Sequence, residues 1–233
     1  MVLRQCSTID FMRLPTKPIV ILWTLAPWPF LAAGLHIFHS IFWSFFLYHG
    51  CCLLPAIIWK RKHWKQHLAL PTKKEVAYLV AGSLIFSFFT WAGFHLLGPY
   101  IFNKQKALES LTYRGFQPSW LVPLSIYFVT VNPIVEELFW RGVVLNELAE
   151  EETKAFSMPS LWTNLLFAAW HVLVIRLFVA PAFMYVAFCT VMAVGIFLSY
   201  LYRRHSSLVL PALWHGLVFD LAVVIILWSV IKG

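Results

Sequence analysis

The chain alternates long apolar runs with short polar segments, and each run is long enough for membrane-spanning helix. A helix needs roughly 20 apolar residues to cross the hydrocarbon core of a bilayer. Residues 19–59 contain no Asp, Glu, Lys or Arg, which suits two spans with a turn near His36, His39 and Ser40. Five further spans are predicted at 76–98, from about 120 through Glu137, and at 161–180, 182–202 and 208–231. We therefore expect an all-α, multi-pass transmembrane bundle of seven spans, or of eight if the fourth run breaks at Pro133.

Composition supports a membrane protein and excludes a soluble globular enzyme, a disordered chain and a disulfide scaffold. The 233 residues are 61% hydrophobic and only 12% charged, whereas soluble domains are about half apolar and a quarter charged. The net charge of +8 comes from short basic clusters between apolar runs, so we expect no nucleic-acid partner. The cysteines lack the spacing of zinc or redox sites, and we expect none to be catalytic: Cys6, Cys51, Cys52 and Cys189.

The basic loops orient the bundle, because Lys and Arg concentrate on the cytoplasmic side of membrane proteins. With seven spans, most basic residues fall on one side, and the N-terminus is predicted to be cytoplasmic. The protein is expected in the inner membrane of a bacterium or archaeon. Glu147 and Glu150–Glu152 are interpreted as a solvated loop. The cytoplasmic set is Arg4, Arg13, Lys17, Lys60, Arg61, Lys62, Lys65, Lys73, Lys74, Lys154, Arg203 and Arg204; the opposite set is Lys104, Lys106, Arg114 and Lys232.

Ionisable residues inside a bilayer are costly and point to function. Glu137 and Arg141 lie four apart, so they share a helix face and can form an ion pair. Glu136 is turned about 100° from Glu137, which leaves its carboxylate free to act as a general base. The structural alternative is a helix end at which these groups reach water.

Two histidines occupy later spans at an overlapping depth. His171 follows Phe167 by four residues and Asn164 by seven, on one helix face, and His215 stands near the start of the last span. With Glu136 they suit either a metal-free attack by activated water or a zinc site. The sequence lacks H-E-x-x-H, and the spacing leaves both chemistries open. His36, His39, His49 and His95 are interpreted as interface or packing residues.

Three motifs in order resemble the CPBP family, which comprises type II CAAX prenyl endopeptidases and bacteriocin-processing or self-immunity proteins (the Abi family). They are E-E-x-x-x-R at 136–141, F-x-x-x-H at 167–171, and a third histidine within Pro211-Ala212-Leu213-Trp214-His215. The resemblance covers about 131–220. We therefore divide the chain into N-terminal spans without a motif, 1–118, and a catalytic helical core, 119–233.

The resemblance implies an intramembrane endopeptidase of the glutamate type. Glu136 and His171 would activate the water, His215 would help to form the oxyanion hole, and Glu137 and Arg141 would hold the motif in shape. No cofactor is implied, with zinc possible but not favoured. Substrates would be membrane-tethered peptides or proteins, as in CAAX processing or bacterial membrane-protein maturation. Membrane lipids are the other expected partner, and the oligomeric state stays open.

One position departs from the family pattern. The last motif is usually H-x-x-x-N or H-x-x-x-D, whereas Phe219 follows His215 at that spacing and Asp220 comes one residue later. On an α-helix this shift turns the carboxylate by about 100°. Asp220 could orient His215, and Asn132 or Asn164 could substitute as the oxyanion donor. The alternatives to a protease are a non-catalytic scaffold or immunity protein and a transporter.

Overall fold

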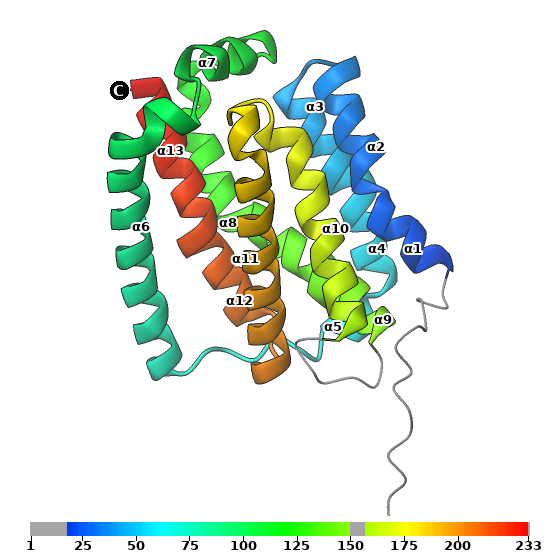
Figure 1. Cartoon of the computed structure of the whole chain (residues 1–233). Helices are drawn as coiled ribbons and strands as arrows, with labels where there is room; N and C mark the ends of the chain where they lie inside the picture. The colour runs from blue at the N-terminus through cyan, green and yellow to red at the C-terminus, as the bar shows by residue number, and fades with distance from the viewer. Residues whose placement is uncertain (1–17, 150–156, 233) are drawn as a thin grey trace, which may run out of the picture.

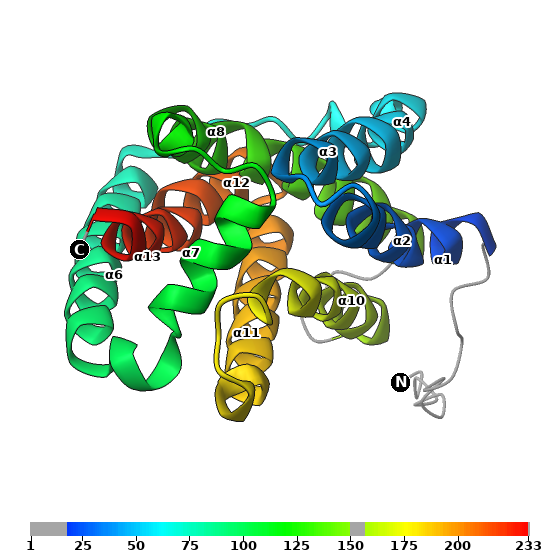
Figure 2. The same cartoon turned by 90° about the horizontal axis from the view of Figure 1, so that it is seen from above.

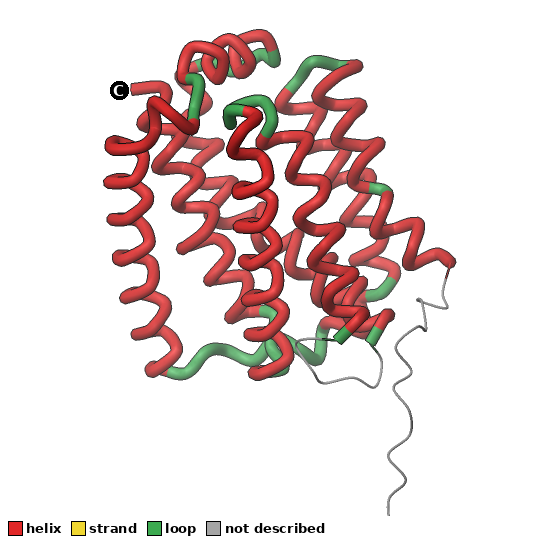
Figure 3. The backbone as a smooth tube through the Cα atoms, viewed as in Figure 1, coloured by secondary structure: helices red, strands yellow, loops and turns green. Residues whose placement is uncertain are grey.

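A computed structural model describes residues 18–149 and 157–232. Within these ranges the protein is all-helical, as predicted (Figure 3). The only extended pairing in them is an isolated bridge between Phe102 and Val179. Several residues used in the sequence predictions lie outside the described ranges: Arg4, Cys6, Arg13, Lys17, Glu150, Glu151, Glu152 and Lys154.

The described residues contain seven helical stretches long and apolar enough to cross a membrane, so the predicted number of spans is confirmed. The protein is a multi-pass integral membrane protein. The spans are Pro18–Ile37, Ile41–Trp59, Lys73–Ile101, Pro118–Leu148, Met158–Ile175, Pro181–His205 and Val209–Lys232.

Most spans combine α-helix with short π-helical or 3₁₀ turns. The first two contain α1 (Pro18–Leu25), α2 (Pro27–Ala32), η1 (Ala33–Ile37), α3 (Ile41–Phe45), η2 (Phe46–Leu53) and α4 (Leu54–Trp59), followed by α5 (Arg61–Trp64). The middle of the chain forms α6 (Lys73–Ile101), α7 (Lys104–Tyr113), η3 (Pro118–Trp120), α8 (Leu121–Phe139), η4 (Trp140–Leu145) and α9 (Asn146–Leu148). The remainder forms α10 (Met158–Ile175), η5 (Pro181–Phe183), α11 (Met184–His205), α12 (Val209–Trp214), η6 (His215–Asp220) and α13 (Leu221–Lys232).

Pro133 does not divide the fourth span, so the eight-span alternative is not the structure. The helix α8 continues through it to Phe139. Proline lacks an N–H, so the carbonyl four residues earlier, that of Val129, loses its helical partner. That carbonyl lies against the last span, as described below.

Local capping chemistry fixes several helix ends. Thr72 and Glu75 form a reciprocal capping box at the start of α6, which satisfies backbone donors there. Ser157 accepts from the backbone N–H of Ser160 and caps α10. That helix ends at Ile175 rather than at the predicted Ala180.

The last span is central and the third is peripheral. Seen from above, α12 and α13 lie between α6, α8 and α11 (Figure 2), and they contact all three. Within the most apolar stretch of 18 residues in each span, 6% is buried in the third span and 44% in the last span. The helix α6 therefore turns most of its apolar side chains outward, where lipid suits them. The short α7 lies across one end of the bundle (Figure 1).

The N-terminal spans share a core with the motif-bearing half. Tyr48 and Leu53 of the second span pack in one cluster with Trp140 and Phe167. Helix α2 contacts α10, and α4 contacts α8. The packing is therefore continuous across residue 118.

Candidate active site

Five ionisable side chains meet in the centre of the bundle. Glu136, Glu137 and Arg141 come from the end of α8 and the start of η4, while His215 and Asp220 come from η6. Each residue is at most 7% exposed. Buried charges destabilise a protein unless they are paired and hydrogen-bonded, so the contacts among them determine what the cluster can do.

The predicted ion pair is present and belongs to a larger network. Arg141 Nη1 donates to Glu137 Oε1 at 2.9 Å. Its Nη2 donates to the carbonyl of Gly195 at 2.8 Å and to Asn164 Oδ1 at 3.2 Å. The guanidinium also lies 4.7 Å from the Phe167 ring centroid. This arginine thus ties the fourth span to the fifth and sixth.

Asn164 lies in this arginine network. Its Oδ1 also accepts from Ser199 at 3.0 Å, and its amide nitrogen donates to Ser160 at 3.3 Å. The polar atoms of Asn164 are therefore engaged around Arg141, away from the imidazole of His215.

His215 is held by Glu137 and faces two other carboxylates. Its Nδ1 donates to Glu137 Oε1 at 2.8 Å, since a carboxylate only accepts. Its Nε2 lies 3.8 Å from Glu136 Oε2 and 3.6 Å from Asp220 Oδ1. These gaps are too long for direct hydrogen bonds but suit a bridging water or a substrate group.

A π-helical turn corrects the expectation for Phe219 and Asp220. Residues His215–Asp220 form η6, and the N–H of Leu221 bonds the carbonyl of Gly216, five residues earlier. The wider turn absorbs one extra residue, which brings Asp220 onto the face of His215. Phe219 instead packs against other aromatic rings, with Phe86 at 5.5 Å. Asp220, not Phe219, therefore faces the imidazole of His215, with its Oδ1 3.6 Å from Nε2.

Asn132 supports Asp220. Its Nδ2 donates to Asp220 Oδ2 at 3.0 Å, and both side chains are buried. This contact links α8 to η6 one turn before Glu136.

A close backbone approach brings the two helices together. A Cβ on Gly216 would clash with the Val129 carbonyl and stand 2.9 Å from Pro133 Cγ. The Val129 carbonyl is the one that Pro133 leaves without a helical partner. Glycine next to His215 therefore allows η6 to rest on the α8 backbone, one to two turns before Glu136.

His171 lies at the edge of the cluster. Its Nδ1 lies 2.6 Å from the Phe167 carbonyl, and its ring stacks on Trp170 at 3.7 Å. The Phe167 ring contacts both imidazoles, at 4.7 Å to His171 and 5.9 Å to His215. Within the described residues, no hydrogen bond or ion pair joins His171 to Glu136, so the structure places it near the acidic cluster without a direct bond.

The second span contributes a polar group that the sequence predictions missed. Tyr48 and His49 lie in η2 and are buried. His49 Nδ1 and the Tyr127 hydroxyl are 2.5 Å apart, and Tyr48 interacts electrostatically with Glu136. The sequence predicts His49 to be an interface or packing residue, and its stacking on the Phe45 ring agrees with that interpretation. Tyr48 is therefore the residue that the sequence predictions missed.

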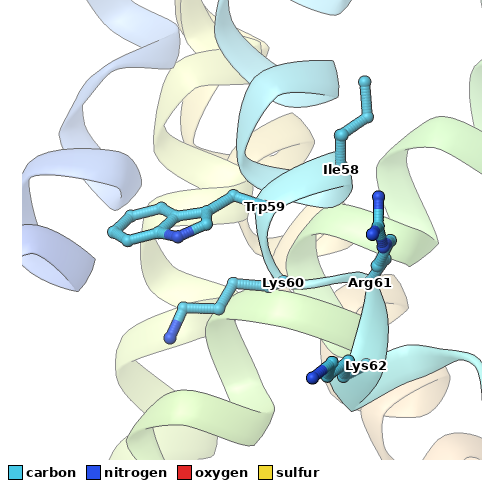
Figure 4. Close-up of a pocket in the computed structure, with 5 residues that line it drawn as sticks. All are labelled: Ile58, Trp59, Lys60, Arg61 and Lys62. Atoms are coloured by element: carbon cyan, nitrogen blue, oxygen red, sulfur yellow. The ribbon is translucent and has the colours of Figure 1, made fainter.

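Two shallow, open hollows lie outside the ionisable cluster. An apolar one of about 350 Å³ lies between α6, α11 and the last span, and its walls include Gly82, Phe197 and Trp214. Another of about 440 Å³ lies at the junction of α4 and α5 (Figure 4) and is lined by Ile58, Trp59, Lys60, Arg61 and Lys62. The first adjoins the segment that carries His215, and the second lies at the basic end of the bundle.

The described side chains do not form a metal centre. No group of three or more His, Cys, Asp or Glu side chains among them is placed to hold a metal ion. We therefore derive no chemical step through zinc.

A comparison with known protein families matches the region that holds all of this cluster except Asp220. A family model described as "Rce1-like: Type II CAAX prenyl endopeptidase Rce1-like" matches residues 118–219. No curated protein and no solved structure matches the chain. The matched region covers somewhat less than half of the chain and includes Glu136, Glu137, Arg141, His171 and His215; over these residues the chain is similar to the Rce1-like type II CAAX prenyl endopeptidase family.

Proposed function

We propose that the protein is an intramembrane endopeptidase in which Glu136 is the general base. The main support is the carboxylate of Glu136, buried 3.8 Å from the Nε2 of an imidazole that Glu137 and Arg141 hold in place. The family match supports a peptidase in general. The assignment of individual roles is our inference from the contacts.

A water between Glu136 and His215 would be the nucleophile. Glu136 takes a proton as the water oxygen attacks the peptide carbonyl carbon, and the carbonyl oxygen becomes an oxyanion. The same proton is then delivered to the amide nitrogen, and the C–N bond breaks to give a carboxylic acid and an amine. The acid then passes its proton to the amine, so the two new ends leave as a carboxylate and an ammonium group. These reaction steps need no external oxidant or metal.

His215 would stabilise the oxyanion. Its Nδ1–H is occupied by Glu137, so only the doubly protonated ring offers an Nε2–H to the substrate oxygen. Glu137 and Asp220 balance the charge of that imidazolium. His171 is proposed as the second water-activating group, acting through its Nε2, because Nδ1 is held by the Phe167 carbonyl.

The substrate is proposed to be a membrane-tethered peptide, as in CAAX processing or the maturation of membrane proteins. The apolar hollow beside the last span could take an apolar part of such a substrate. The basic end of the bundle, where α5, the end of α11 and the start of α6 lie together (Figure 1), supports contact with anionic lipids on the cytoplasmic side. The N-terminus is proposed to be cytoplasmic on the same grounds.

The test is cleavage of a panel of membrane-tethered reporter peptides by purified protein in lipid. We expect cleavage by the wild type and none by Glu136→Gln, which keeps the size of the side chain but cannot accept the proton. Glu109→Gln is the matched control, because Glu109 is exposed on α7, and it should cleave like the wild type. Cleavage that survives Glu136→Gln would overturn the mechanism. A wild type that cleaves none of the peptides would favour a non-catalytic scaffold.

A further inference from the structure

Tyr48, in the second span, presents a buried hydroxyl to the acidic cluster. The residue is 1% exposed, and its hydroxyl has no hydrogen-bond partner within ordinary geometry among the described residues. A buried hydroxyl without a partner costs free energy. Its place therefore needs an explanation beyond packing.

Complementary atoms surround this hydroxyl. The same region holds Trp140 Nε1, a donor, and Glu136 Oε2, an acceptor, each without a partner among the described residues. Tyr48 interacts electrostatically with both side chains. A small side-chain adjustment would satisfy the carboxylate and the hydroxyl together, since a carboxylate only accepts and a tyrosine can donate.

Aromatic packing keeps the Tyr48 ring in this position. Its centroid lies 4.7 Å from that of His49 and 4.7 Å from that of Trp170. Trp170 in turn stacks on His171 at 3.7 Å. The ring is thus wedged between the second span and α10 and cannot turn its hydroxyl to water.

We propose that Tyr48 is a positioning residue that donates a hydrogen bond to Glu136 and keeps its carboxylate aimed at the water beside His215. This inference rests on the proposed endopeptidase function. Tyr48 lies outside the matched residues 118–219, so the family region would need the second span to complete its site.

The kinetic test compares Tyr48→Phe with Tyr202→Phe. Both changes remove one hydroxyl from a buried ring, but the Tyr202 hydroxyl donates to Asn146 at 2.7 Å, apart from the acidic cluster. We expect Y48F to lower kcat by about ten- to a hundredfold, the range for a hydrogen bond to a charged group, with KM within twofold. Y202F should leave both within twofold. A raised KM with unchanged kcat, or equal losses in both variants, would overturn the proposal.

An infrared measurement tests the hydrogen bond without requiring turnover. The difference between wild type and Glu136→Gln identifies the Glu136 carboxyl band. We expect that band to shift in Y48F and not in Y202F; an unshifted band would overturn the proposal. If Y48F does not fold, the infrared spectrum of Glu136→Gln tests the hydrogen bond alone. Loss of the carboxylate should then shift the C–O band of Tyr48, and an unshifted band would overturn the proposal. An absent cleavage activity would then count against the proposed function only.

Discussion

Glu137 and His215, 78 residues apart in the sequence, are joined by a 2.8 Å hydrogen bond from the imidazole Nδ1 to carboxylate Oε1. The same oxygen accepts from Arg141 at 2.9 Å. One carboxylate therefore neutralises the buried arginine and also fixes which imidazole nitrogen faces Glu136. Under the proposed mechanism the two adjacent glutamates would therefore act differently: Glu136 would take the proton, while Glu137 would hold the arginine and the imidazole in place.

Glu137→Gln should destabilise the protein, unlike Glu136→Gln. Removing the charge leaves Arg141 buried without its ion-pair partner, which typically costs about 3–5 kcal/mol. Thermal unfolding in detergent measures the loss, with the exposed Glu109→Gln expected to stay within about 0.5 kcal/mol of wild type. A Glu137→Gln protein as stable as wild type would show that the ion pair with Arg141 does not stabilise the fold.

Gly216→Ala should separate the helices that hold the site. The new methyl group would clash with the Val129 carbonyl and Pro133. The shift of the helices that relieves this clash should lower the free energy of unfolding by about 1–3 kcal/mol and should remove most of the cleavage activity. Gly93→Ala is the control, because nothing lies within 4 Å of its added Cβ. Unfolding and cleavage assays on both variants give the comparison; equal behaviour would show that the close approach is dispensable.

Deleting Phe219 should be better tolerated than deleting a residue from regular helix. The deletion converts the π-turn to an α-helical turn and leaves His215 and the aspartate four apart, on one face. We expect cleavage within about tenfold of wild type. Deleting Val224 in α13 turns every later side chain by about 100° and should abolish folding. Loss of cleavage on deletion of Phe219 from a folded protein would contradict the equivalence of the two spacings.

Strong chelators should leave cleavage unchanged. The prediction follows from the geometry of the donors, because no three metal-ligating side chains among the described residues are placed to hold one ion. The measurement is reporter cleavage after treatment with phenanthroline, followed by addition of zinc. Inhibition that zinc reverses would establish a metal enzyme and remove Glu136 from its role as the direct base.

Much of the fold follows from the sequence because the bilayer imposes a simple rule. An apolar run of sufficient length must become a helix, so the seven spans and the turn after Ile37 were predictable. The pairing of Glu137 with Arg141 was equally predictable, because it depends only on their spacing within one helix.

The missed features depend on packing between helices. No local pattern indicates that Tyr48 should meet Glu136, because the two residues come from different spans and share no spacing rule. The π-turn at His215 was missed for a related reason. Its wider geometry is held by the neighbouring α6, where Ser83 donates to the Leu217 carbonyl at 2.6 Å, and an isolated helix would favour the regular turn.

The peripheral position of α6 has a consequence for how cleavage should be measured. Ile85 and Phe86 line the apolar hollow and are 58% and 38% exposed on the outer face, where the bilayer is the solvent. A tethered substrate that arrived there would travel by two-dimensional diffusion within the leaflet. The relevant concentration would then be substrate molecules per lipid. Adding empty lipid to fused vesicles would slow the reaction even though the amounts of enzyme and substrate per millilitre stayed the same.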